Sequence, residues 1–537
     1  GNHIPFALCP NDSLLADKFM KLMKEGNVQS TRTHTTPWNE LWVSAADRNG
    51  IAISFEGTWS WLMIHSTPIP DKGVLDLWSS EWLRVMKKYR NHPSVFFWTV
   101  NNEMKFYDLD ADTERAKQKF RIVSDVVKDM RKTDPTRPVC FDSNYLHNKA
   151  SKRFGDDFLK TVDDGDIDDN HAYYNWYDYS VFRFFNGEFQ KQFKSPGRPL
   201  ISQEMSTGYP NAETGHPTRS YQLIHQNPYS LIGYEAYDWG NPASFLNTQS
   251  FITGELAETL RRTNEQASGI MHFAYMTWFR QCYDHRNIQP YPTYYAMQRA
   301  MQPVLVSAEL WGRNLYAGEK LHTRIYVVND NEEGRDLKPM SLAWSIVDET
   351  NKVLASGTEQ FPAVEYYGRK YIEPNIHMPS NLPADKVNVK LKLTLTESGV
   401  TLSQNEYGLL LARKEWNIGQ ITADKKVLLL DKDHMKATLD FLNIACQTVP
   451  SIKELLNAKQ KANLCIISGL KECTDEEARL LREYQSKGGR ILFLNSKEAA
   501  QKVYPEYITG WIIPTEGDIV VMERNDAPVF DGIGALE

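Results

Sequence analysis

Two glutamates close two short apolar segments of the chain, and together they could carry out acid–base chemistry on a glycosidic bond. Glu103 ends the stretch NHPSVFFWTVNNE at residues 91–103, and Glu204 ends the stretch RPLISQE at residues 198–204. Both apolar runs are typical of short buried strands. A carboxyl group at the exit of a buried strand is half shielded from water, and burial can raise its pKa until it serves as a proton donor.

Paired carboxylates at the ends of two parallel strands are what retaining glycoside hydrolysis requires. One group protonates the leaving oxygen while the other attacks the anomeric carbon from the opposite face, at a separation of about 5–5.5 Å. A separation above about 6.5 Å would favour an inverting enzyme instead. A glutamate at a strand end, such as Glu103, is more often a surface acid than a catalyst. The presence of the second glutamate makes the catalytic interpretation the more favoured one.

Strand and helix patterns alternate along the first part of the chain, which predicts a (β/α)8 barrel over residues 1–302. All strands of such a barrel end on the same face, so Glu103 and Glu204 would meet there. The long insertion at residues 205–267 would shape specificity on that face. We expect the eight strands to end at or lie within residues 1–3, 27–34, 51–56, 95–100, 139–142, 171–177, 198–204 and 269–278.

The segment NHPSV at residues 91–95, followed by Trp98 and then Asn102 and Glu103, resembles the acid/base signature of glycoside hydrolase family 2. This family contains β-galactosidases, β-glucuronidases and β-mannosidases. The resemblance implies that Glu103 is the acid/base residue and that Asn102 bonds the sugar 2-hydroxyl. It also implies that Glu204 is the nucleophile, in a context of QEMS where the family more often has TEYG.

Two further positions on the second and third predicted strands match the family. The segment RTHTTP at residues 32–37 is similar to the family's VRTSHYP, with the histidine displaced by one position. This match implies that Arg32 forms a buried ion pair near the nucleophile, and the alternative is a structural arginine paired with a core acid. Glu56 matches the family's glutamate at the end of the third strand, and we expect it to orient its neighbours.

Aromatic segments supply the remaining candidates for substrate binding. The segment HAYYNWY at residues 171–177 resembles the family's Asn-x-Tyr-x-x-Trp-Tyr. By this match Tyr173 donates a hydrogen bond to Glu204, and His171 takes the position of the family's asparagine. Trp278, at the end of the segment GIMHFAYMTW at residues 269–278, fits the aromatic floor that the family has under the sugar. The alternative is that these rings only pack the mouth of the barrel.

Two further domains are expected after the barrel. Residues 303–413 contain long segments in which polar and apolar residues alternate, which predicts an immunoglobulin-like β-sandwich. Residues 414–537 alternate short apolar strands with helices, which predicts a doubly wound α/β domain. This last region looks like the flavodoxin-like, amidotransferase-like domain of some β-galactosidases. Cys465 lies within a strand and Cys473 precedes a helix, so we predict no second active site there.

Composition excludes several classes of function. A net charge of −7 argues against nucleic acid as a partner, and no apolar run is long enough to cross a membrane. The six cysteines form no C-x-x-C pair, so neither a metal nor another cofactor is expected. The aspartates of residues 163–169 could suggest calcium, but their spacing is not that of an EF-hand loop, and we expect a solvated turn.

The sequence therefore predicts a retaining exo-β-glycosidase, closest in type to a β-galactosidase, that acts on an oligosaccharide or polysaccharide-derived substrate. The alternatives are a β-glucuronidase, a β-mannosidase or, from another class, a non-catalytic carbohydrate-binding protein. Because the family carries β-domains ahead of its barrel, we expect this chain to be part of a longer protein. The substrate class suggests a secreted or periplasmic location, and a homo-oligomer remains open.

Overall fold

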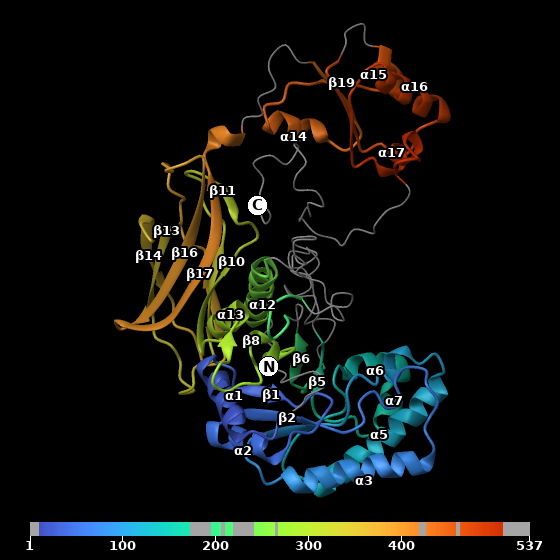
Figure 1. The fold of residues 1–537 in the computed structure, drawn as a ribbon, viewed down its shortest axis with the longest axis vertical. Coiled ribbons are helices and arrows are strands. Elements are labelled where there is room, and N and C mark those ends of the chain that lie inside the picture. The colour runs from blue at the N-terminus through green and yellow to red at the C-terminus, as the bar shows by residue number, and fades with distance from the viewer. Residues whose placement is uncertain are drawn as a thin grey trace.

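The computed structural model describes residues 10–171, 195–205, 210–217, 241–263, 267–417, 426–457 and 462–508. Figure 1 shows three parts in chain order: a strand-and-helix part coloured blue to green, an all-β part in yellow, and a smaller α/β part in orange to red. Among these residues, no helix is both long enough and apolar enough to cross a membrane.

The first part contains seven described strands in two sheets, ordered β1-β2-β3-β4 and β5-β6-β7. Every pairing in the two sheets is parallel, as a barrel requires. The segment predicted to end the first barrel strand, residues 1–3, lies outside the described residues. The strands are β1 (Ser30–Arg32), β2 (Ala52–Glu56), β3 (Val95–Thr99), β4 (Val139–Cys140), β5 (Asp168–Asp169), β6 (Leu200–Met205) and β7 (Ala267–His272).

One predicted strand lies mostly outside the described residues, and another ends earlier than expected. The sixth strand was predicted within residues 171–177, of which only His171 is described, and the structure shows β5 just before it, at Asp168–Asp169. This strand was missed because it is polar, and its aspartates are buried only because other groups satisfy them. The last strand was predicted over residues 269–278, but β7 ends at His272, and a 3-10 helix, η3 (Tyr275–Trp278), follows it.

Helices alternate with the strands and pack around them (Figure 1). The shared core is rich in tryptophan: Trp42, Trp78, Trp82 and Trp98 are fully buried. Burying one such side chain contributes roughly 1.5–3 kcal/mol, so these rings account for much of the barrel's stability. The helices are α1 (Ser13–Glu25), α2 (Glu40–Asn49), α3 (Lys72–Tyr89), α4 (Phe106–Leu109), α5 (Thr113–Thr133), α6 (His147–Phe154), α7 (Asp156–Leu159), α12 (Ala243–Thr263) and α13 (Pro292–Ala300), and a small hairpin joins β8 (Phe279–Arg280) to β9 (Gln289–Pro290).

The aspartate-rich segment at residues 163–169 is not the solvated turn that its composition suggested. Arg131 contacts Asp163 at 2.6 Å, and Arg198 contacts Asp168 at 2.9 Å. The carboxylates are thus used as partners for arginines that connect neighbouring elements of the barrel. The prediction failed because both arginines are distant in sequence, so no local pattern reveals the pairing.

The second part consists of two sheets that share one hydrophobic core, in the orders β10-β12-β15 and β11-β17-β16-β13-β14. Its alternating pattern is confirmed in β16, where Val389, Leu391, Leu393 and Leu395 are buried between more exposed neighbours. The immunoglobulin-like class of this part stays a prediction. The strands are β10 (Val304–Glu309), β11 (Asn314–Tyr316), β12 (Arg324–Asn329), β13 (Met340–Asp348), β14 (Val353–Phe361), β15 (Arg369–Ile372), β16 (Lys386–Glu397) and β17 (Val400–Ala412).

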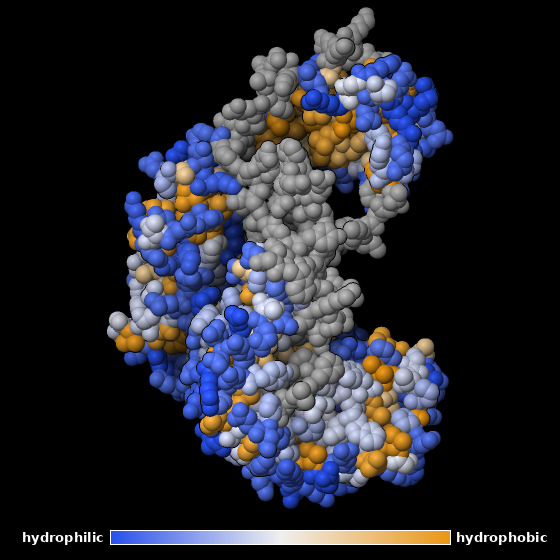
Figure 2. All heavy atoms as spheres, viewed as in Figure 1, coloured by the Kyte–Doolittle hydropathy of each residue, from blue (hydrophilic) through white to orange (hydrophobic). Residues whose placement is uncertain are grey.

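The third part is a small parallel sheet in the order β19-β18-β20-β21. Leu439 of α14 packs on one face, while α15, α16 and α17 contribute to the core on the other. Figure 2 shows apolar side chains gathered on the surface of this part, near its top. A flavodoxin-like class stays a prediction. The elements are η4 (Lys414–Asn417), β18 (Val427–Asp431), α14 (Met435–Phe441), β19 (Gln447–Val449), α15 (Ile452–Asn457), β20 (Leu464–Ser468), α16 (Asp475–Ser486), β21 (Ile491–Leu494) and α17 (Lys497–Val503).

A buried carboxylate on α12 joins the barrel part to the two-sheet part. Glu258 is 5% exposed, and its oxygens accept hydrogen bonds from the Tyr407 hydroxyl at 2.7 Å and from the Asn405 side chain at 2.9 Å. Ser307 also donates to it. A carboxylate buried between two domains is stable only while hydrogen-bond donors surround it. Because the donors to Glu258 come from the two-sheet part, this contact fixes the orientation of the two parts.

We therefore expect Glu258→Ala to lower the free energy of unfolding by roughly 3 kcal/mol, because the buried donors lose their acceptor. Urea unfolding followed by tryptophan fluorescence measures this change. The matched control is Glu406→Ala on β17, which removes an exposed contact with Lys390 at 2.9 Å and should change stability by less than about 1 kcal/mol. Equal effects of the two substitutions would contradict the role assigned to Glu258.

Candidate active site

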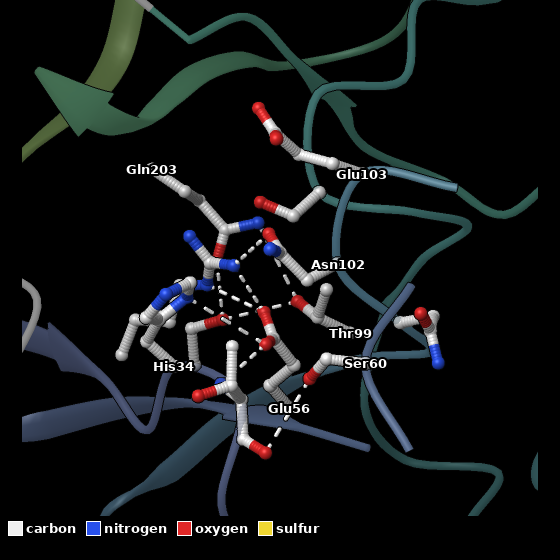
Figure 3. Close-up of polar contacts among 12 residues, drawn as sticks. His34, Glu56, Ser60, Thr99, Asn102, Glu103 and Gln203 are labelled. Atoms are coloured by element: carbon white, nitrogen blue, oxygen red, sulfur yellow. Dashed lines mark hydrogen bonds and ion pairs between the residues drawn. The ribbon is translucent and has the colours of Figure 1, made fainter. Parts of the chain in front are cut away.

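The carboxyl ends of β1, β2, β3 and β6 bring polar side chains to one face of the barrel. Arg32 is the last residue of β1 and Glu56 the last of β2, while Asn102 and Glu103 follow β3 and Glu204 lies near the end of β6. In Figure 3, the labelled His34, Glu56, Asn102 and Gln203 point toward one another, and Glu103 lies above them.

Arg32 connects three of these strands through its guanidinium group. It donates to Glu56 at 2.6 Å, to Glu204 at 2.7 Å and to the side-chain oxygen of Asn102 at 2.6 Å. Burial of Arg32 disfavours the charged form, but the two carboxylates outweigh it and raise the pKa of the guanidinium above its ordinary value. The sequence left open whether Arg32 pairs with the nucleophile candidate or with a core acid, and the structure shows both contacts.

Glu103 and Glu204 approach each other closely across the barrel face. Together with His171, they present ligand-type atoms that all lie within 4.8 Å of one another, so a carboxylate oxygen of each glutamate falls within that distance. Glu103 adopts a positive φ of 49°, directly after β3, and its backbone N–H donates to the Ser143 carbonyl at 3.1 Å. This turn directs the side chain over the barrel mouth rather than along the strand.

His171 lies between the two glutamates. Its Nδ1 is 2.6 Å from Glu103 Oε1 and 3.1 Å from Glu204 Oε2, and its Nε2 is 2.7 Å from the Ser143 hydroxyl. Burial lowers the pKa of His171, but its contacts with Glu204, Asp169 and Glu103 outweigh burial. These contacts raise the pKa above its ordinary value, to about 10. The imidazole is therefore a cation at neutral pH, held among three acids.

The pKa of Glu103 moves in the opposite direction to the one its position in the sequence suggested. Burial favours the neutral carboxyl, but the hydrogen bond from His171 and the charges of His171 and Lys105 outweigh it and hold the pKa below its usual range. Lys105 Nζ lies 2.9 Å from Glu103 Oε1. The sequence pointed to desolvation alone, and it gave no sign that two cations would converge on this carboxylate.

A layer of polar residues below Glu204 was missed in the sequence. The backbone N–H and the side-chain amide of Gln203 donate to Asp169 at 2.9 and 3.0 Å, and Ser54 Oγ donates to Gln203 at 2.6 Å. Asp169 also accepts from Ser143 at 2.9 Å. This layer links β2, β5 and β6 and fixes the position of Glu204. The only available signal was that polar residues interrupt otherwise apolar strands.

Trp278 is not part of the site in this structure, which corrects the prediction of an aromatic floor. The side chain is fully buried, and its indole N–H donates to His272 at 2.7 Å. The reason is that β7 ends six residues earlier than Trp278. The aromatic ring beside the site is Phe273, which meets His34 edge to face with ring centres 4.7 Å apart.

His34 joins the site despite its displaced position in the motif. Its Nδ1 lies 3.6 Å from Glu204 Oε1. Burial and the neighbouring charge of Arg32 lower the pKa of His34 well below its ordinary value, so it stays neutral. Tyr173 lies outside the described residues, as do residues 206–209, 218–240 and 264–266 of the insertion. The predicted hydrogen bond from Tyr173 to Glu204 therefore stays a prediction.

A metal ion is not needed to explain the close approach of Glu103, His171 and Glu204. The distances from His171 Nδ1 to the two carboxylates, 2.6 and 3.1 Å, are those of hydrogen bonds. A zinc ion would instead have to lie about 2.0–2.2 Å from each nitrogen or oxygen ligand. The expectation of no metal stays a prediction.

Parallel strands with paired glutamates at their carboxyl ends define a barrel of the glycosidase type. Residues 8–239 match the family model for the TIM barrel domain of glycosyl hydrolases family 2. This match confirms the resemblance to glycoside hydrolase family 2 that was found around Glu103.

Three known proteins are similar to the chain. It is 23% identical over 298 residues to a β-galactosidase of Pectobacterium atrosepticum, an alignment that covers 53% of this chain and 24% of that protein. A β-D-mannosidase from Dictyoglomus thermophilum matches with a TM-score of 0.52 at 18% identity, over 76% of this chain and 49% of that one. An exo-chitosanase from Amycolatopsis orientalis matches with a TM-score of 0.50 at 13% identity, over 76% and 48% of the two chains.

At these identities, the likeness to the two solved structures shows the shared fold alone. The chain spans about a quarter of the β-galactosidase, at 24%, and about half of the two structures, at 49% and 48%.

We expect Arg32→Met to lower the free energy of unfolding by roughly 3–5 kcal/mol, because it leaves buried carboxylates without their cation. The double variant Arg32→Met/Glu56→Gln should recover part of this loss, since the second change removes one uncompensated charge. Arg48→Met is the control, because it removes an exposed contact with Asp17 at 2.8 Å. Chemical unfolding of the four proteins measures the differences, and no recovery in the double variant would contradict the charge argument.

The raised pKa of His171 predicts that the protein becomes less stable as the pH rises. Because the folded state raises this pKa from 6.5 to about 10, the stabilisation is fully present below pH 6.5 and is lost as the pH rises toward 10. We expect the unfolding free energy of the wild type to fall across this window, and that of His171→Gln to fall less. Unfolding curves at several pH values test this, and parallel profiles for the two proteins would contradict a cationic His171.

Proposed function

We propose that this chain contains the catalytic domain of a retaining exo-β-glycosidase. The observation that supports it is the approach of Glu103 and Glu204, whose carboxylate oxygens lie within 4.8 Å. Retaining enzymes keep their two carboxyl groups about 5–5.5 Å apart, whereas inverting enzymes need about 6.5–9.5 Å to admit a water molecule. The spacing therefore favours double displacement over inversion.

In the proposed reaction, Glu204 attacks the anomeric carbon and forms a covalent glycosyl-enzyme. The leaving oxygen takes a proton from Glu103, which then removes a proton from water as the water releases the sugar. Arg32 and the layer below Glu204 hold this carboxylate in a fixed direction. Asn102, which is held by Arg32 at 2.6 Å, is placed to bond the sugar 2-hydroxyl.

His171 supplies the proton that Glu103 lacks. The proton on Nδ1 lies in a hydrogen bond of 2.6 Å to Glu103 Oε1, so it can pass directly to the carboxylate. In the step that follows, Glu103 delivers this proton to the leaving oxygen, and the neutral imidazole remains paired with Ser143. The charge of the site is conserved, because the proton departs with the leaving group while Glu204 loses its negative charge by forming the bond to the sugar.

A β-galactosidase is the specificity that we favour. The support is the 23% identity to the β-galactosidase of Pectobacterium atrosepticum and the small α/β part at the end of the chain. A β-glucuronidase or a β-mannosidase would use the same catalytic residues. The division into domains at residues 1–302, 303–413 and 414–537, with a flavodoxin-like last domain, is part of this proposal.

A non-catalytic carbohydrate-binding protein is the second candidate. The observation that favours it is the lowered pKa of Glu103, since an acid that is ionised in the free protein cannot donate a proton unaided. A binding protein would bind sugar with little dependence on Glu204. The variant Glu204→Ala therefore distinguishes the two candidate functions.

We expect the protein to hydrolyse one member of a panel of nitrophenyl β-glycosides and to release the β-anomer first, as seen by proton NMR. Glu204→Ala should abolish turnover because the nucleophile is lost. Glu103→Ala should lower turnover of substrates with poor leaving groups by about 10²–10⁴-fold, because general acid catalysis is lost.

Azide tests the two roles separately. It should restore turnover of Glu204→Ala with an α-glycosyl azide as the product, and that of Glu103→Ala with a β-glycosyl azide. Glu40→Ala, which changes an exposed carboxylate on α2, is the control and should keep full activity. Unchanged sugar binding by Glu204→Ala, with no hydrolysis by the wild type, would favour the binding-protein alternative instead.

A further inference from the structure

A cavity lies where the last turn of α12 meets the sheet β10-β12-β15. It has a volume of about 750 Å³, and both polar and aromatic side chains line it. α12 leads into the amino end of β7, whereas Phe273 and the candidate active site lie beyond the carboxyl end of the same strand. The cavity is therefore at the opposite end of the barrel, and no residue assigned to the candidate active site lines it.

Aromatic rings form one side of this cavity. Trp311 is 46% exposed and Tyr371 is 48% exposed, although both are large and partly apolar. The ring of Tyr371 packs against that of Tyr326 with centres 5.1 Å apart, and the Arg324 guanidinium lies 5.0 Å from its centre. Rings that are fixed by such contacts present flat surfaces on which the C–H face of a sugar can stack.

A buried carboxylate provides a fixed hydrogen-bond acceptor beside these rings. Glu309 is 5% exposed, and its Oε1 accepts from the Trp311 indole N–H at 2.7 Å. Its second oxygen is buried, and the Tyr326 side chain also interacts with this carboxylate. Glu309 therefore holds the Trp311 ring in place at the cavity.

The charge of the cavity differs from that of the whole chain. Of the described residues, four cationic side chains and two carboxylates line it, an excess of positive charge in a chain with a net charge of −7. Arg324 forms an ion pair with Glu373 at 3.4 Å, and both side chains are exposed. The cations are Arg262, Lys320, Arg324 and Arg369, and the carboxylates are Glu309 and Glu373.

We propose that this cavity binds an acidic glycan, with a sugar ring stacked on Trp311 and a carboxylate or sulfate group held by Lys320 and Arg324. A guanidinium group can bind either anion through two parallel hydrogen bonds. The site goes beyond the proposed hydrolysis and does not depend on it, because it shares no residue with Glu103 or Glu204.

Calorimetric titration of the full chain with three α-linked oligosaccharides of equal length tests the proposal. They are an oligogalacturonate, which carries carboxylates, a sulfated malto-oligosaccharide, which carries sulfates, and a neutral malto-oligosaccharide. None has the β-linkage of the proposed substrates, so hydrolysis does not interfere. We expect at least one acidic ligand to bind, the neutral ligand to bind more weakly, and added salt to weaken the acidic ligand. The acidic ligand that binds identifies the recognised group.

Trp311→Ala and the double variant Lys320→Ala/Arg324→Ala should each weaken this binding by about tenfold or more, because they remove the stacking surface and the anion partners. Tyr367→Ala is the control, since Tyr367 is an aromatic residue of the same part that is 71% exposed and does not line the cavity. Because the substituted side chains are exposed, we expect each variant to fold, and thermal unfolding verifies this.

Failure of this proposal is distinguishable from failure of the proposed hydrolysis. Hydrolysis of small nitrophenyl glycosides should be the same in Trp311→Ala and in the wild type. The proposal is overturned if no acidic glycan binds, if Trp311→Ala binds it as tightly as the wild type, or if the neutral ligand binds equally well.

Discussion

A guanidinium group sealed from water sets the geometry of the barrel face. Arg32 is fully buried, and a buried cation is tolerated only when acceptors surround it. Glu56, Asn102 and Glu204 supply those acceptors from the ends of three different strands, at 2.6–2.7 Å. The same contacts that stabilise the charge therefore hold the proposed nucleophile and the proposed sugar ligand in place, so stability and function depend on one residue.

The charges above Arg32 form a second balanced group. His171 carries the positive charge between Glu103 and Glu204, and Asp169 stabilises it from below at 3.5 Å. Burial alone would push Glu103 and His171 toward their neutral forms, but the close contact between them favours the ionised form of each. In the proposed reaction this arrangement stores the catalytic proton on a histidine rather than on the carboxyl group that uses it.

Local patterns were sufficient for much of the fold. Apolar runs that end in polar residues predicted β3 and β6, and alternation predicted β16, because burial of one or both faces of a strand leaves a direct record in sequence. The strand β5 escaped because Asp168 and Asp169 are polar residues that become buried only through partners such as Arg198 and Gln203. Such partners are distant in sequence, and no local pattern contains them.

By itself, the sequence determined the family resemblance of the barrel and the pairing of Glu103 with Glu204, since short motifs at strand ends carry both. Only the tertiary structure decided the environment of those groups. It placed His171 and Lys105 beside Glu103, so that the pKa of this carboxyl is lowered rather than raised. It also removed Trp278 from the site and brought Phe273 to it. The physical reason is that electrostatic shifts and ring contacts depend on distances between segments, which the chain fixes only when it folds.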